Sequence, residues 1–166
     1  MTRGDMKNTD HPAVEKLRTG ISSLDVIAKG GLPKNRTTLI SGTAGSGKTV
    51  FAIQFLAAGI EQGEPGVFVT FEESAADIRR NMRSFGWDLA AWEAEGKLTF
   101  VDASPDPHID TVEAGGFDLG ALIARVDNAV KKSRRSESPS IRSALCSRSS
   151  RIRRWCGASF SELPRR

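Results

Sequence analysis

The sequence has few of the features that mark exported, membrane-embedded or disulfide-stabilised proteins. The first ten residues lack the apolar run of a signal peptide, and no later stretch approaches the roughly 20 apolar residues of a membrane-spanning helix. The two cysteines, Cys146 and Cys156, form no CxxC pair and have no histidine nearby, so neither a metal motif nor a disulfide framework is indicated. His11 and His108 stand in polar stretches and are expected to be solvated. We expect a cytoplasmic protein without membrane contacts.

Acidic side chains are scarce in one part of the chain. Residues 1–130 carry 13 basic and 18 acidic groups, whereas residues 131–166 carry 11 basic and only 2 acidic groups. A chain whose parts differ this much is expected to consist of segments with different roles. We expect a flexible N-terminus at residues 1–14, one folded domain at residues 15–132, and a basic tail at residues 133–166.

The middle segment alternates between apolar runs and amphipathic patterns. Residues 37–41, 67–71 and 98–101 are short apolar or β-branched runs bounded by turn residues, which predicts buried strands. Residues 48–62 have helical composition, and Ser74 has the spacing of a helix cap. This order predicts an α/β fold with a mostly parallel sheet covered by helices.

A glycine-rich loop, Gly-Thr-Ala-Gly-Ser-Gly-Lys-Thr, lies between the first predicted strand and helix. Its glycines let the backbone curl so that amide hydrogens point at phosphate oxygens. Lys48 is expected to reach the β and γ phosphates, and Thr49 to offer its hydroxyl to Mg²⁺ at the positive end of the helix. Because such a loop contacts phosphates only, it does not distinguish ATP from GTP. The predicted nucleotide-binding residues are Gly42, Thr43, Ala44, Gly45, Ser46, Gly47, Lys48 and Thr49.

Two acidic residues, Glu72 and Glu73, directly follow the second predicted strand. They stand at the carboxyl end of that strand, where open α/β sheets place their ligands. One carboxylate there can orient the water that attacks a γ-phosphate, while the lysine of the loop stabilises charge. We therefore predict Glu72, Glu73 and Lys48 as catalytic residues. The alternative is that both acids are solvated loop residues, and the spacing alone does not choose between these interpretations.

Several longer motifs accompany the loop in a fixed order. They are Thr-Gly at 19–20, Leu-Asp at 24–25, Gly-Gly-Leu-Pro at 30–33, Gly-Val-Phe-Val-Thr-Phe-Glu-Glu at 66–73, Ser-Phe-Gly-Trp-Asp-Leu at 84–89 and Asp-Ala-Ser-Pro-Asp-Pro at 102–107. In this order they resemble the KaiC family of RecA-like ATPases, over about residues 15–132. The resemblance implies a RecA-like P-loop NTPase fold, of which this chain holds a part.

The resemblance also carries functional expectations. It implies an ATPase that uses ATP and Mg²⁺ and assembles as a hexamer with nucleotide at subunit interfaces. It implies a circadian-clock or related signalling system with KaiB-like and KaiA-like partners, and it assigns the acids matching Glu72 and Glu73 to hydrolysis. Full-length members also carry a second domain with serine/threonine autokinase activity. Two alternatives stay open: a non-catalytic nucleotide-binding adaptor for full-length relatives, and a RecA- or RadA-like ATPase that handles DNA.

The tail at residues 133–166 is unlike the rest of the chain. It contains ten serines and nine arginines without a helical or strand period, so we expect it to be disordered. In the KaiC family this region supplies a strand ending in aspartate, the Walker B element associated with Mg²⁺. Without that strand we expect a sheet that is incomplete on its C-terminal side, an open sheet edge, and weak or no hydrolysis.

The tail also suggests a change of reading frame, natural or from sequencing. GC-rich coding DNA read out of frame often yields arginine, serine, proline and alanine. From the third base of the Glu137 codon, an allowed back-translation reads Val-Ser-Val-Asp-Ser-Ile-Gly-Ala-Leu-Phe, which is a Walker B strand. The tail's arginines could instead pair with the phosphates of nucleic acid or of an anionic membrane. We favour a solvated basic tail over such a contact.

Overall fold

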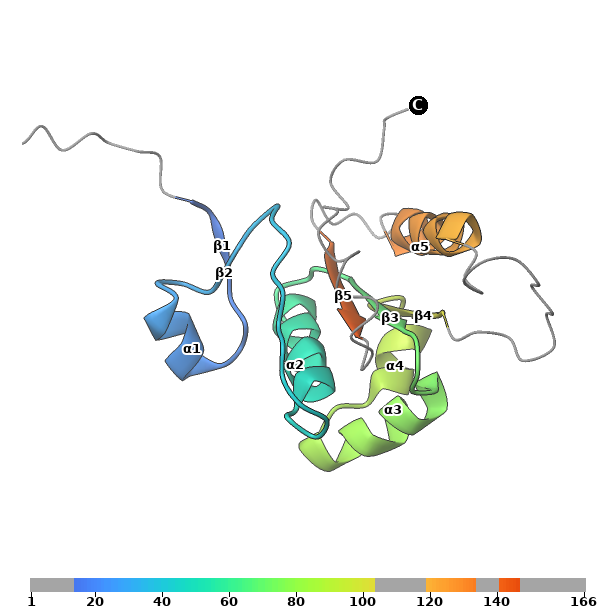
Figure 1. Ribbon diagram of the computed structural model, residues 1–166, viewed down its shortest axis with the longest axis horizontal. Coiled ribbons are helices and arrows are strands. Elements are labelled where there is room, and N and C mark those ends of the chain that lie inside the picture. The colour runs from blue at the N-terminus through green and yellow to red at the C-terminus, as the bar shows by residue number, and fades with distance from the viewer. Residues whose placement is uncertain (1–13, 104–118, 134–140, 147–166) are drawn as a thin grey trace, which may run out of the picture.

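A three-stranded parallel sheet lies at the centre of the computed structural model, which describes residues 14–103, 119–133 and 141–146 (Figure 1). The middle strand is β3 (Gly66–Thr70), flanked by β4 (Leu98–Asp102) and β5 (Arg142–Cys146). Gly66 lies opposite the first residues of both flanking strands, and Thr70 lies opposite their last residues. All three strands therefore end at the same edge of the sheet.

Helices cover both faces of this sheet (Figure 1). On one face lie α2 (Lys48–Ile60), α3 (Ala75–Met82) and α4 (Leu89–Ala94), with the short 3₁₀ turn η1 (Arg83–Phe85) after α3. On the other face lies α5 (Leu119–Ser133). The predicted α/β fold with a parallel sheet is confirmed, with its layers in the expected arrangement.

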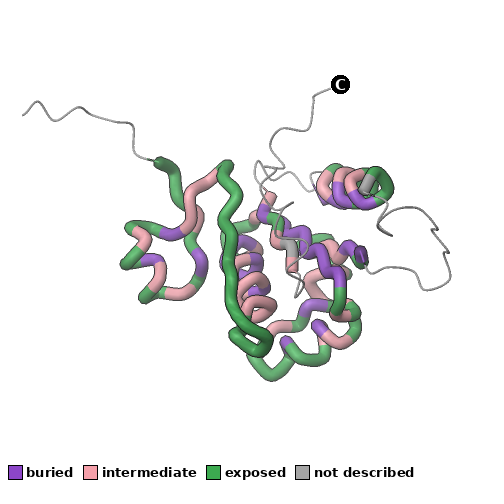
Figure 2. Tube along the Cα trace, viewed as in Figure 1, coloured by how far each residue is buried: buried purple, intermediate pink, exposed green. Residues whose placement is uncertain are grey.

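The middle strand is buried along its whole length because both of its faces are covered (Figure 2). Val67 and Val69 pack toward α5 with Leu122 and Val126, whereas Phe68 packs toward α2 and α3. This alternation follows from the two-residue period of a strand. A strand that is buried at every position, as this one is, fits only a sheet with helices on both sides.

The N-terminal part of the described chain forms a small antiparallel unit. β1 (Lys16–Leu17) pairs with β2 (Leu32–Pro33), and α1 (Ser22–Ile27) lies between them in sequence. Thr19 donates two hydrogen bonds to Asp25 Oδ1, from its backbone amide at 2.8 Å and from its hydroxyl at 2.7 Å. The Thr-Gly and Leu-Asp motifs of the sequence therefore serve a structural purpose here, since this carboxylate closes the turn that leads into α1.

The expected strand at residues 37–41 does not form. This segment is an exposed coil without a ladder to any described strand, and Leu39 and Ile40 are 62% and 41% exposed. Its β-branched and apolar composition favours a strand, but a strand exists only where a neighbour completes its backbone hydrogen bonds. The prediction of a buried strand ahead of the glycine-rich loop was therefore wrong for this chain.

The tail was expected to contribute no strand, and this was also wrong. Residues 142–146 form β5, which pairs with β3 in the same register as β4 does. Tertiary context decides this: Arg142 is buried and bonded to the core, and Ala144 and Cys146 pack beside the apolar cluster under α2. The strand ends in Cys146 and contains no aspartate. Residues 134–140 and 147–166, on which the rest of the tail prediction falls, lie outside the described residues.

None of the helices in the described ranges is long and apolar enough to cross a membrane.

Candidate nucleotide-binding site

The glycine-rich loop leads directly into α2, which begins at Lys48. Gly45 and Gly47 have φ angles of 79° and 81°, in the left-handed region that side chains disfavour. A Cβ atom on Gly42 would lie only 2.4 Å from Ser46 Oγ, so a side chain at this position would force the Ser46 hydroxyl to rotate away. The backbone amides at the start of α2 donate no hydrogen bond to a capping side chain. A helix that begins in this way presents free N–H groups and a positive dipole end to an anion.

The ammonium group of Lys48 folds back onto the loop. Its Nζ donates to the carbonyl oxygens of Gly42 at 3.0 Å and Thr43 at 2.8 Å. Ser46 Oγ lies at 3.5 Å from the same nitrogen. These bonds hold the charge beside the loop, where an anionic ligand can take over the bonds that the two neutral carbonyls accept.

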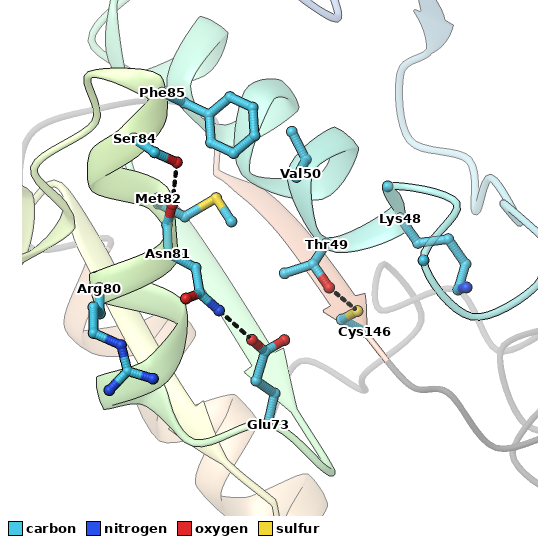
Figure 3. A pocket seen from close by; sticks show the side chains of 12 residues that line it. Lys48, Thr49, Val50, Glu73, Arg80, Asn81, Met82, Ser84, Phe85 and Cys146 are labelled. Carbon is cyan, nitrogen blue, oxygen red and sulfur yellow. Dashed lines mark hydrogen bonds between the residues drawn. The ribbon is translucent and has the colours of Figure 1, made fainter.

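Thr49 lies at the inner end of the loop and contacts the end of β5. Its Oγ1 is 3.3 Å from Cys146 Sγ, and either atom can donate in this contact (Figure 3). Both side chains are half-buried. Local sequence pattern does not associate Cys146 with this site, because the contact requires β5, a strand that this pattern does not predict.

The opposite wall of the site comes from the loop after β3 and from α3. Glu73 Oε1 accepts a hydrogen bond of 3.0 Å from Asn81 Nδ2, and Thr70 Oγ1 donates to the Glu73 carbonyl at 2.7 Å. Figure 3 shows Glu73 and Asn81 facing Thr49 and Cys146 across the pocket. The cavity has a volume of about 500 Å³. It is lined by Gly45, Gly47, Lys48, Thr49, Val50, Glu73, Arg80, Asn81, Met82, Ser84, Phe85 and Cys146.

The structure separates the two candidate acids. Glu73 lines the cavity together with Lys48 and Thr49, whereas Glu72 is exposed and does not line it. Asn81 joins the site without having been singled out in the sequence. Asn81 stands eight residues after Glu73, near the end of α3. The two side chains meet only because α3 folds back over the loop that contains Glu73.

The side chains around Thr49 fit Mg²⁺ poorly. Mg²⁺ selects oxygen ligands, usually one or two carboxylates with water and phosphate oxygens. Thr49 supplies a hydroxyl, but the neighbouring atom is the sulfur of Cys146, and Glu73 is bonded to Asn81 on the far wall. No group of three or more His, Cys, Asp or Glu side chains within the described ranges could hold a metal ion. The role of Thr49 as a Mg²⁺ ligand therefore stays a prediction, and no carboxylate cluster among the described residues supports it.

Comparison with known proteins identifies relatives of this chain. A family model described as "ATPase: KaiC" matches residues 17–141. The chain is 57% identical over 127 residues to the circadian clock protein KaiC3 of Synechocystis sp., covering 76% of this chain and 25% of that protein. It is 56% identical over 139 residues to the circadian clock oscillator protein KaiC of Synechococcus elongatus, covering 81% of this chain and 27% of the relative. The chain thus spans about a quarter of the length of these relatives.

Proposed function

This chain belongs to the KaiC family of ATPases, and from that premise we propose that it binds ATP through residues 42–49. The observation that carries the proposal is the cavity of about 500 Å³ that the loop and the first turn of α2 share with Glu73. The left-handed conformation of Gly45 and Gly47 and the open start of α2 support phosphate binding there.

Each element of the loop has a proposed task. Backbone amides between Gly42 and Thr49 donate to phosphate oxygens, and the N-terminus of α2 favours their negative charge. Lys48 exchanges the carbonyls of Gly42 and Thr43 for the β and γ phosphates. The exchange is favourable because anionic phosphate oxygens attract the Lys48 ammonium more strongly than neutral carbonyl oxygens do.

A binding titration with a fluorescent ATP analogue tests the proposal. Lys48→Ala should weaken binding by at least about tenfold, because it removes the charge that contacts the phosphates. Lys97→Ala is the matched control, since Lys97 is an exposed lysine paired with Glu95 away from the cavity. Equal affinity of the Lys48→Ala variant and the unmodified chain would reject the proposal. Competition with unlabelled ATP and GTP then identifies the preferred base.

We propose that hydrolysis by this chain is weak or absent. Glu73 lies on the wall facing the loop and is the residue that we expect to orient an attacking water, with Glu72 as a second, more exposed acid. β5 ends in a thiol where the family's strand is expected to end in a carboxylate. Phosphate release by this chain should therefore fall far below that of a full-length relative. A comparable rate that Lys48→Ala abolishes would contradict this expectation.

The functions of longer KaiC proteins extend the proposal. We propose that the intact protein acts as a hexameric ATPase in a clock or related signalling system, with KaiB-like and KaiA-like partners. A second candidate, an adaptor that docks onto full-length relatives, is supported by the position of β5 at the edge of the described sheet. Size-exclusion chromatography with ATP separates the two: mixed rings with a full-length relative favour the adaptor.

We also keep the proposal of a changed reading frame near codon 137. The abrupt change in composition supports this proposal. A changed frame would still leave the sheet with a strand on this side, because residues 142–146 of the present sequence form β5. Sequencing the coding DNA across codons 130–140 tests this proposal. An unshifted frame without a Walker B reading would reject it.

A further inference from the structure

A hydrogen bond from Asn81 holds the side chain of Glu73 on one wall of the cavity. Asn81 Nδ2 donates to Glu73 Oε1 at 3.0 Å. The backbone of Glu73 is fixed as well, because the buried hydroxyl of Thr70 donates to its carbonyl oxygen at 2.7 Å. Asn81 is fixed through α3, which is anchored in the core by the buried side chains of Ile78 and Met82. The bond therefore joins two supported positions and directs the carboxylate toward α3.

The cavity brings opposite charges close together. Among the described residues that line it, Glu73 is the only acid, and Lys48 and Arg80 are the cations. Arg80 is paired with Asp77, with 2.6 Å between its Nη2 and Asp77 Oδ1. Lys48, in contrast, donates to neutral oxygen atoms of the glycine-rich loop. Because a carboxylate and an ammonium group in one cavity attract each other, Glu73 is a potential competitor of the phosphates for Lys48.

The structure keeps these two charges on opposite sides. Figure 3 shows the carboxylate of Glu73 facing Asn81, whereas the side chain of Lys48 lies against its own loop. If Glu73 left Asn81 and paired with Lys48, a phosphate would have to displace an anion instead of neutral carbonyl oxygens. The ion pair would have to break before Lys48 could bind phosphate, so nucleotide affinity would fall.

We propose that Asn81 is a positioning residue that retains Glu73 on the α3 side of the cavity and thereby leaves Lys48 available for the phosphates. This inference rests on the proposed binding of nucleotide at residues 42–49. Asn81 acts through Glu73 and requires no contact of its own with the nucleotide. Since Lys48 is expected to contact the β and γ phosphates, the loss of Asn81 weakens ATP binding more than ADP binding.

The test measures the affinities of the full chain for fluorescent analogues of ATP and ADP. Asn81→Ala and Asn81→Leu should each weaken ATP binding by about three- to tenfold, because both lack the donor and leucine keeps a similar side-chain size. ADP binding should weaken less. Asn128→Ala is the matched control, since Asn128 is an exposed asparagine on α5, on the other face of the sheet. It should leave both affinities unchanged.

The decisive comparison uses Glu73→Gln, which keeps the shape of the side chain and removes its charge. In that background Asn81→Ala should change ATP affinity by less than about twofold, because no carboxylate competes for Lys48. An equal loss in both backgrounds would show that Asn81 only supports α3 and would overturn the proposal. Unchanged ATP affinity in both Asn81 variants would overturn it too.

The variant Lys48→Ala separates this proposal from the binding of nucleotide itself. If ATP binding depends on Lys48 but not on Asn81, residues 42–49 still bind nucleotide and only the role of Asn81 is rejected. Absence of ATP binding by the unmodified chain would overturn both proposals.

Discussion

The two flanks of the central strand are each held by an arginine–glutamate pair. On the β5 side, Arg142 Nε donates to Glu64 Oε2 at 2.5 Å, and its guanidinium lies 4.8 Å from the ring centroid of Phe55. On the β4 side, Arg79 donates to Glu93 through two bonds of 2.6 and 2.9 Å. Its guanidinium lies 5.1 Å from the ring centroid of Phe100. The side chain of Arg142 is 1% exposed, whereas that of Arg79 is 33% exposed.

The difference in burial gives the two pairs different structural roles. Arg142 also donates to the carbonyl oxygens of Arg18 at 2.6 Å and Phe55 at 3.2 Å, so one side chain joins β5, α2 and the N-terminal segment. A buried charge that loses its partners is far more costly than an exposed one. β5 thus combines the apolar contacts of Ala144 and Cys146 with one charged network around Arg142. β4 is held mainly by Leu98 and Val101 in the core, and the pair of Arg79 adds a link between α3 and α4.

Removal of β5 should have the largest effect. A chain that ends after residue 140 leaves the β5 side of β3 unpaired and uncovers the apolar surface under α2. We expect it to lose the cooperative unfolding transition in urea, because a domain's whole stability is only about 5–15 kcal/mol. A chain that ends after residue 146 is the matched control. If both chains unfolded identically, β5 would contribute nothing to the fold.

Arg142→Ala should be the most damaging single substitution on either flank. It removes the ion pair and two bonds to carbonyls, and leaves Glu64 without its buried partner. The expected loss in the free energy of unfolding is about 3–5 kcal/mol, measured by urea denaturation. Arg80→Ala breaks an exposed pair with Asp77 and should cost less than about 1 kcal/mol. Similar losses in the two variants would show that burial does not distinguish these pairs.

Asp25→Asn should have an intermediate effect that depends on pH. Burial raises the pKa of Asp25, but hydrogen bonds from Thr19 and Gly20 outweigh it, so this pKa lies below its ordinary value. The carboxylate therefore stabilises the fold above the unfolded-state pKa of about 3.9, and this contribution is lost as the pH falls through the folded-state pKa. At pH 7 the substitution should cost about 2 kcal/mol.

The pH series provides the control for Asp25. Below the folded-state pKa the carboxyl is protonated in both states, so the cost of Asp25→Asn should shrink as the pH is lowered toward that value. Asp25 and Thr19 hold the turn that follows Arg18, and the Arg18 carbonyl accepts a hydrogen bond from Arg142. The Asp25→Asn variant therefore also tests whether this turn supports the bond to Arg142. A cost that does not change with pH would contradict the proposed role of the charge.

Arg79→Ala should have the smallest effect of the four. The pair is bidentate but about one third exposed, so its loss should cost about 1 kcal/mol, between the values for exposed and buried pairs. A double-mutant cycle with Glu93→Gln isolates the interaction energy of the pair. An interaction energy as large as the loss in Arg142→Ala would remove the distinction between the flanks.

The two flanks also differed in how well their strands could be predicted. The apolar run that became β4, the capped helix α3 and the loop before α2 were recognisable because local pattern and tertiary position agree there. Ser74 accepts the predicted hydrogen bond from the Asp77 amide, at 3.1 Å. β5 has the sequence Arg-Ser-Ala-Leu-Cys, which no regular strand period marks as a strand. The segment at residues 37–41 has the reverse property: its composition is typical of a strand, but it pairs with no strand among the described residues.

Local residue patterns alone specify the glycine-rich loop, the helix α2 that follows it, the core strand β3 and the family. These features depend on residue types at short spacings, where glycine conformation, helix caps and apolar runs act locally. Only the tertiary structure decided that Arg142–Cys146 is a strand, that residues 37–41 are not, and that Cys146 lies beside Thr49. A strand is stabilised by hydrogen bonds from a neighbouring strand that is distant in sequence. Thr49 and Cys146 are 97 residues apart, so their contact exists only once β5 has paired with β3.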